Sequence, residues 1–131
     1  MAAHGVPYVA TASASHLPDL ARKIAKAKTI RGTKIVTLLI PCLDGWGVDD
    51  DKGLMAARLA VESGAFPLVE VEDGVRWTVN TAKTRPIGDY LAVQRRYRHL
   101  GAEQAAALQA EIDVGWARLQ QRAQAPAAAA M

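Results

Sequence analysis

The apolar run Ile35-Val36-Thr37-Leu38-Leu39-Ile40 is the feature that most constrains this chain. The run does not alternate between apolar and polar residues, and Pro41 ends it. A short run of this kind, rich in β-branched residues, is typical of a parallel strand that is covered on both faces. It is far too short to span a bilayer. We therefore predict that residues 34–40 form a central strand of a parallel sheet.

The segments around this strand alternate between strand and helix signals. Residues 6–12 predict a strand, and a helix follows that can be capped by Ser15 or His16 and ends before Gly32. After the central strand, the pattern predicts a helix, two strands that flank the Asp73-Gly74 turn signal, and two C-terminal helices. Their expected ranges are 52–63, 68–71, 75–79, 86–100 and 101–122.

The helix between the first two predicted strands, which ends before Gly32, is predicted to be amphipathic. Leu17, Leu20, Ile24 and Ala27 recur at helical spacing and mark the face that should pack on the sheet. We expect the basic residues of this helix to lie mainly on the solvent side. These residues are Arg22, Lys23, Lys26 and Lys28.

This order of elements predicts an α/β fold with a mostly parallel sheet. A sheet with so few parallel strands would leave apolar faces uncovered, so we expect the chain to form half of a larger sheet. We place the sheet-forming domain at residues 1–85, a helical extension at 86–124 and a disordered tail at 125–131.

Composition limits the classes of function. The chain has 131 residues, of which 50% are hydrophobic, and a formal net charge of +3. Its single cysteine excludes an internal disulfide, and we see no signal peptide, so we expect a cytoplasmic protein without a membrane segment. The one basic cluster, residues 95–99, lacks a recognisable nucleic-acid-binding module, so we expect no nucleic-acid partner.

Cys42 is the main candidate for chemistry. It follows the carboxyl end of the predicted central strand, which is where open α/β sheets bind their ligands. The residues alone leave three interpretations open: an ordinary, partly buried thiol, a nucleophile that needs a nearby base, or a metal ligand that needs further ligands. The spacing of the three histidines, His4, His16 and His99, does not place any of them beside the thiol.

Other polar residues give weaker signals. An acidic cluster could bind a hard cation, but its spacing favours a solvated loop before a helix. The Gly45-Trp46-Gly47 sequence predicts a tight turn with an anchoring indole. Arg95, Arg96 and Arg98 are expected on a solvated or subunit-facing helix side. The acidic cluster comprises Asp44, Asp49, Asp50 and Asp51.

Five segments, in this order, resemble one protein family. They are AAHGVPYVATAS (2–13), IPCLDGW (40–46), RLAVESGAFPL (58–68), EVEDG (70–74) and PIGDYLAVQRRYRHL (86–100). The family is the thiamine-diphosphate-binding subunit of pyruvate and related 2-oxoacid:ferredoxin oxidoreductases, and the resemblance covers residues 2–100. It implies the C-terminal half of a three-layer thiamine-diphosphate-binding fold.

The resemblance also implies a function. Such enzymes oxidatively decarboxylate a 2-oxoacid to acyl-CoA with thiamine diphosphate and Mg²⁺, and they pass electrons through [4Fe-4S] clusters to ferredoxin. In that family the cysteine of the Pro-Cys sequence is the last ligand of a [4Fe-4S] cluster, and Cys42 matches it. The family's other cluster cysteines and its Gly-Asp-Gly…Asn cofactor segment are absent from this sequence.

No cofactor site is therefore complete in this chain. We expect either a truncated reading frame or a naturally split subunit, inactive alone, whose missing N-terminal half or companion subunits supply the remainder. Two alternatives from other classes remain at this point. One is a small basic α/β interaction or nucleic-acid-binding module, and the other is a thiol-dependent enzyme centred on Cys42.

Overall fold

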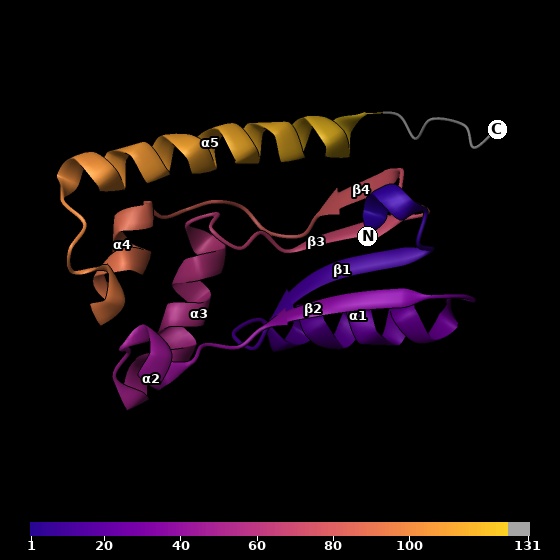
Figure 1. Ribbon diagram of the computed structural model, residues 1–131. Coiled ribbons are helices and arrows are strands. Elements are labelled where there is room, and N and C mark those ends of the chain that lie inside the picture. The colour runs from indigo at the N-terminus through magenta and orange to yellow at the C-terminus, as the bar shows by residue number, and fades with distance from the viewer. Residues whose placement is uncertain (126–131) are drawn as a thin grey trace.

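Four strands form one sheet in the order β2-β1-β3-β4 in the computed structural model, which describes residues 1–125 (Figure 1). β1 and β2 are parallel, whereas β3 pairs antiparallel with both β1 and β4. The α/β class is thus confirmed, and the expected parallel order applies to the β1–β2 pair within a mixed sheet. The strands are β1 (Tyr8–Ser13), β2 (Lys34–Leu39), β3 (Val69–Glu72) and β4 (Arg76–Val79).

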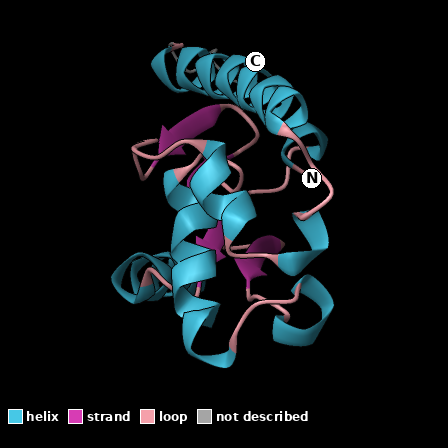
Figure 2. Ribbon diagram, turned by 90° about the vertical axis from the view of Figure 1, so that its left-hand side faces the viewer, coloured by secondary structure: helices cyan, strands magenta, loops and turns pink. Residues whose placement is uncertain are grey.

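The longer helices lie around this sheet. α1 (Leu17–Thr29) connects β1 to β2 and lies to one side of the strands, α3 (Gly53–Glu62) stands at their end, and α5 (Ala102–Gln124) crosses beside β4 (Figures 1 and 2). No helix in this part of the chain is both long and apolar enough to cross a membrane. The shorter helices are η1 (Ala2–His4), α2 (Leu43–Trp46), η2 (Asp50–Lys52), α4 (Ile87–Ala92) and η3 (Arg95–Tyr97).

The β3–β4 turn forms where the sequence predicts it. Asp73 and Gly74 have φ values of 53° and 75°, and Val75 N–H donates to the Glu72 carbonyl (3.1 Å). Two successive positive φ values match the right-handed twist of a hairpin and favour an Asp-Gly pair. A Cβ at Gly74 would lie 2.7 Å from the Ala2 carbonyl oxygen, so the turn also packs against η1.

The predicted helix over residues 86–100 is instead two short helices. Gln94 has an extended backbone (φ −121°, ψ 113°), and its side-chain amide donates to the Tyr90 carbonyl (2.6 Å). This side chain satisfies a carbonyl that a continuing helix would bond through its backbone, so α4 ends and η3 begins after the break. α5 ends at Gln124, and the predicted tail lies outside the described residues except for Ala125.

The apolar run forms β2 as far as Leu39, but β2 is an edge strand of the described sheet. Leu38 is 39% exposed and Ile40 is 64% exposed, so the run is not covered on both faces. The prediction of a central strand is wrong for this part of the molecule because β3 and β4 add to the other side of β1.

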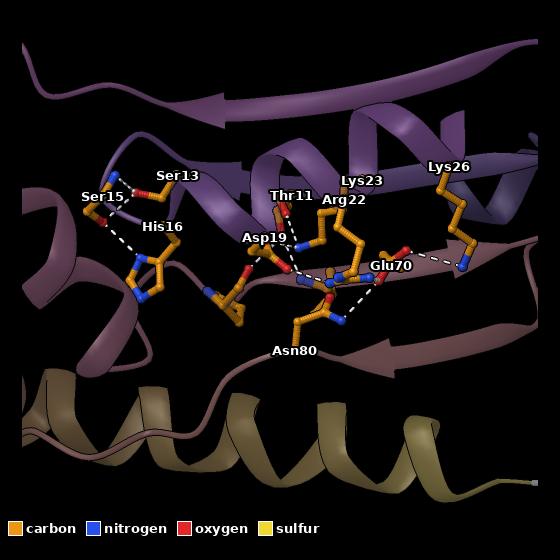
Figure 3. Close-up of polar contacts among 12 residues, drawn as sticks. Thr11, Ser13, Ser15, His16, Asp19, Arg22, Lys23, Lys26, Glu70 and Asn80 are labelled. Atoms are coloured by element: carbon orange, nitrogen blue, oxygen red, sulfur yellow. Dashed lines mark hydrogen bonds and ion pairs between the residues drawn. The ribbon is translucent and has the colours of Figure 1, made fainter. Parts of the chain in front are cut away.

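The buried carboxylate of Glu70 on β3 joins the sheet to α1. Its Oε1 accepts from the Tyr8 hydroxyl (2.8 Å). Its Oε2 accepts from Arg22 Nη1 (2.8 Å) and Asn80 Nδ2 (2.9 Å) (Figure 3). Lys26 Nζ lies 3.2 Å from Oε1. Burial alone would raise the pKa of Glu70, but these hydrogen bonds lower it to about 2. Glu70 is therefore ionised in the folded chain at neutral pH.

Lys23 of α1 places a second buried charge between this helix and β1. Its side chain is fully buried, and Nζ donates to the Thr11 carbonyl (2.7 Å) and to Asp19 Oδ2 (2.6 Å). Burial lowers the pKa of Lys23, and the hydrogen bond to Asp19 opposes that shift. The ammonium group thus remains paired where water does not reach it.

The predicted orientation of α1 is therefore only partly confirmed: Arg22 and Lys28 are exposed, but Lys23 is buried. Lys23 faces the sheet, and Arg22 and Lys26 reach Glu70, whereas Leu17 and Ile24 are 63% and 39% exposed. A buried carboxylate requires paired cations, and this requirement overrides the apolar periodicity of the helix. The apolar stripe of α1 is therefore rotated away from the sheet, with Leu17 and Ile24 exposed and Leu20 and Ala27 half-buried.

We predict that Glu70→Gln lowers the free energy of unfolding by about 3 kcal/mol, because it leaves buried cations without their anion. Chemical denaturation measures this change. Glu72→Gln is the matched control: it removes a partly exposed carboxylate on the same strand, paired with Lys26 and Arg76, and should cost less than about 1 kcal/mol. Equal effects of the two variants would contradict the role of Glu70.

Acid should lower the free energy of unfolding of the wild-type chain by protonating Glu70. Because folding lowers the pKa of Glu70 from 4.5 to about 2, its stabilising contribution is present above pH 4.5 and is lost as the pH falls towards 2. In Glu70→Gln, the dependence of the unfolding free energy on pH should flatten across this window. An unchanged slope would show that other carboxylates cause the acid sensitivity.

Candidate functional site

The carboxyl ends of β1 and β2 bring the candidate residues of two loops to one edge of the sheet. The two strands are parallel and in register from Tyr8–Lys34 to Ser13–Leu39, and Ala14 N–H donates to the Leu39 carbonyl (3.2 Å). The loop after β1 carries serine and histidine side chains, and the loop after β2 carries Cys42. His4 lies in η1, which precedes β1 and is therefore at the opposite end of the strands (Figure 1).

A chain of side-chain hydrogen bonds follows β1. Ser13 Oγ is bonded to Ser15 Oγ (2.9 Å), which is bonded to His16 Nδ1 (2.9 Å) (Figure 3). Ser13 is fully buried. His16 occupies the N-cap position of α1 but makes no side-chain capping bond. The sequence pattern suggested Ser15 and His16 only as possible caps, although three polar residues just after a parallel strand are a signal for a site at that strand end.

The Cys42 loop is a single short turn of helix. Cys42 precedes α2, and its carbonyl accepts from Trp46 N–H (2.9 Å), while Gly47 closes the turn with φ 63°. A Cβ at Gly45 would lie 3.0 Å from Cys42 Sγ, so the sulfur packs against the backbone of the turn. The cysteine is exposed, which contradicts the partly buried state of an ordinary thiol. The turn thus presents the thiol at the surface.

Residues of η3 hold this turn from outside. Arg95 N–H donates to the Gly47 carbonyl (3.0 Å), and Arg95 Nη1 donates to Asp49 Oδ1 (2.8 Å). The Arg96 guanidinium lies 4.3 Å from the centroid of the Trp46 ring and 4.6 Å from that of Tyr97. Cation–π contacts of this kind favour a fixed arrangement. We call this set of contacts between residues 46–49 and 94–97 the loop clamp.

The Trp46 indole contacts both the loop clamp and α4. Trp46 also meets the Tyr90 ring edge-to-face, with centroids 6.5 Å apart, and Arg96 is oriented by two hydrogen bonds to Gln94 Oε1 (3.0 and 2.7 Å). The tight turn and its anchoring Trp46 were predicted, but the contact with residues 94–97 was not. Arg95, Arg96 and Arg98 are exposed, in agreement with the expected solvated side, and His99 is exposed too.

The acidic cluster is spread over the loop and η2. Asp49 pairs with Lys52 (2.7 Å) and Arg95, and the hydrogen bond from Lys52, then its charge and the bond from Arg95, lower the pKa of Asp49. Asp44, Asp50 and Asp51 are exposed. Within residues 1–125, no group of three or more His, Cys, Asp or Glu side chains is placed to hold a metal ion. The cluster fits the predicted solvated loop before a helix.

Comparison with known proteins gives a consistent set of relatives. No protein-family profile matches the chain. It is 49% identical over 114 residues (86% of the chain) to pyruvate synthase subunit PorB of Methanocaldococcus jannaschii, covering 38% of that protein. It is 47% identical over 114 residues to PorB of Methanothermobacter marburgensis and 37% identical over 126 residues to ketoisovalerate oxidoreductase subunit VorB of Pyrococcus horikoshii, covering 40% of each. The chain therefore spans about two fifths of the length of these relatives, and the similarity extends beyond the 2–100 range given by its motifs.

The exposure of Cys42 predicts a fast and stoichiometric thiol reaction. An aromatic disulfide reagent should modify one thiol per native chain without denaturant, because Cys42 is the only cysteine and is exposed. Absorbance of the released thiolate measures the reaction. A thiol that reacts only after unfolding would contradict the geometry of the turn.

The backbone of the turn predicts a specific cost for Gly47→Ala. Gly47 has a positive φ, and a Cβ there would lie 2.7 Å from Arg95 Cβ. We expect Gly47→Ala to lower the unfolding free energy by about 1–3 kcal/mol and to change the rate of Cys42 modification. Gly88→Ala is the control, since its Cβ meets nothing within 4 Å, and it should leave both quantities near the wild-type values. Equal behaviour of the two variants would show that the loop clamp does not constrain the turn.

Proposed function

Because the chain is homologous to one part of the PorB and VorB subunits, we propose that it is part of the thiamine-diphosphate-binding subunit of a 2-oxoacid:ferredoxin oxidoreductase. The complete enzyme would oxidatively decarboxylate pyruvate or a related 2-oxoacid to acyl-CoA and pass the electrons through iron–sulfur clusters to ferredoxin. The observation that carries this proposal is the 49% identity to PorB over 86% of the chain. The exposed thiol at the carboxyl end of a parallel strand supports it.

In this proposal Cys42 is one ligand of a [4Fe-4S] cluster in the assembled enzyme. The fixed turn presents its thiol outward, where a partner can reach it. One thiolate does not hold a cluster, and the sequence has no second cysteine, so the other ligands come from another polypeptide or another part of the subunit. Nothing in residues 1–125 forms a cradle for thiamine diphosphate and Mg²⁺ comparable to the Gly-Asp-Gly…Asn segment of the family. We therefore assign no chemical step to this chain alone.

The partners follow from the same proposal. The chain acts with the remainder of its subunit and with companion subunits in the cytoplasm, and ferredoxin accepts the electrons through the complex. The alternative of a basic nucleic-acid-binding module is disfavoured by the ion pairs of the basic side chains. Arg22, Lys23 and Lys26 pair with carboxylates, and Arg96 stacks on Trp46.

Iron content of the assembled complex tests the role of Cys42. The complex should be purified through a tag on this chain from its source organism, under anaerobic conditions. We expect Cys42→Ala to remove about four iron atoms per copy of the chain, with the matching loss of one cluster signal in electron paramagnetic resonance. Asp44→Asn is the matched control, since it changes an exposed residue of the same turn and leaves the thiol in place.

The two parts of the proposal fail separately. Unchanged iron in Cys42→Ala would remove the ligand role while leaving the enzyme assignment intact. A wild-type complex that contains no thiamine diphosphate by mass spectrometry would remove the enzyme assignment itself.

A further inference from the structure

The guanidinium of Arg96 is exposed but is held in one orientation. It lies 4.3 Å from the centroid of the Trp46 ring and 4.6 Å from that of Tyr97, and its Nε and Nη2 both donate to Gln94 Oε1 (3.0 and 2.7 Å). An exposed arginine side chain loses rotational freedom when it is held, so these contacts offset an entropic cost. The planar group is therefore preorganised before any partner reaches it.

The break between α4 and η3 makes this orientation possible. Gln94 lies at the break with an extended backbone, and its side chain is buried. Its amide nitrogen donates to the Tyr90 carbonyl (2.6 Å), which directs the amide oxygen to Arg96. The same break brings the backbone N–H of Arg95 to the Gly47 carbonyl (3.0 Å). The interruption of the predicted helix thus places Arg96 against the Cys42 turn.

The contacts of Arg96 leave its positive charge uncompensated. Within the described residues, the groups that hold its guanidinium are an amide oxygen and two aromatic rings, which carry no net charge. Arg95 differs, since it pairs with the carboxylate of Asp49 (2.8 Å). The charge of Arg96 also acts on its surroundings: burial raises the pKa of Tyr90, and the positive charge of Arg96 opposes that shift. A fixed cation is therefore present at this turn.

Arg96 holds the turn on which Cys42 lies. Trp46, on which Arg96 stacks, donates its N–H to the Cys42 carbonyl (2.9 Å), so the stacked indole and the cysteine close the same helical turn. In the proposed function Cys42 is the residue of this chain that binds an iron–sulfur cluster, and its exposed thiol fits that role. A cluster bound through this thiol lies beside the turn that Arg96 holds.

We propose that Arg96 sets the reduction potential of the iron–sulfur cluster that Cys42 ligates in the assembled enzyme. This inference rests on the proposed function. Reduction adds one electron to the cluster, which comes from the 2-oxoacid and leaves towards ferredoxin. A cation fixed beside the cluster stabilises the reduced state, because that state is the more negative one. Arg96 is not a ligand: it acts through its charge, and its stacking on Trp46 keeps that charge in place relative to Cys42.

Redox titration followed by electron paramagnetic resonance tests the effect of the charge. The complex is purified as above, and the cluster is identified as the signal that Cys42→Ala removes. We expect Arg96→Gln to keep its iron and to make reduction of this cluster about tenfold less favourable, which lowers the potential by about 59 mV for a one-electron couple. Arg98→Gln is the matched control, since it removes the same charge from an exposed side chain outside the loop clamp and should leave the potential unchanged.

Arg96→Lys separates the charge from the shape of the side chain. Lysine keeps the positive charge but has no planar group to stack on Trp46 or to donate two N–H groups to one oxygen. We expect this variant to recover most of the shift in potential caused by Arg96→Gln. If Arg96→Gln instead loses its cluster, Arg96→Lys should retain the iron and a potential near the wild-type value.

Several results would overturn the inference. One is a potential that is unchanged in Arg96→Gln, and another is an equal shift in Arg98→Gln. A third is an Arg96→Lys variant that matches Arg96→Gln in potential or in loss of iron, since Arg96 would then have only a structural role. All three leave the proposed function standing, because the wild-type complex still carries its cluster and thiamine diphosphate. A wild-type complex without iron would remove the ligand role of Cys42, and this inference with it.

Discussion

The buried carboxylate of Glu70 determines how the rest of this chain is arranged. A charge in the middle of β3 is tolerated only with cations around it, and α1 provides them through Arg22 and Lys26, with Lys23 buried beside them on the same face. To do so the helix must turn its charged side to the sheet. Leu17 and Ile24 are then exposed, and Leu20 is only half-buried. An electrostatic requirement in the core thus leaves apolar side chains of α1 at the surface.

The loop clamp holds the Cys42 turn at the carboxyl end of the parallel strands. The Cys42 turn contains only four helical residues and is too short to be stable by itself. It is fixed by contacts from residues more than 45 positions later, chiefly the Arg95–Gly47 hydrogen bond and the Arg96–Trp46 stack. The exposed Cys42 thiol therefore lies on a turn that is held by the C-terminal extension, which links the two segments that we separated as domains.

The sequence predicted the elements better than their surroundings. The strands, the Asp73-Gly74 turn and α3 follow from local residue chemistry, which the sequence contains in full. The orientation of α1 did not follow, because it depends on Glu70, which lies 48 residues after Arg22. The edge position of β2 was also missed. Its continuous apolar run is typical of a strand covered on both faces, and the sequence does not show that the described sheet ends at this strand. Cys42 was found through its place after a strand, whereas the loop clamp depends on long-range contacts that spacing does not reveal.

The free edge of β2 also affects how the chain behaves when it is present in excess. Val36-Thr37-Leu38-Leu39-Ile40 is a β-prone, uncharged segment without proline, which is the composition that promotes cross-β stacking. Two unoccupied edges that meet can form fibrils. The rate of aggregation should therefore rise with the concentration of the chain.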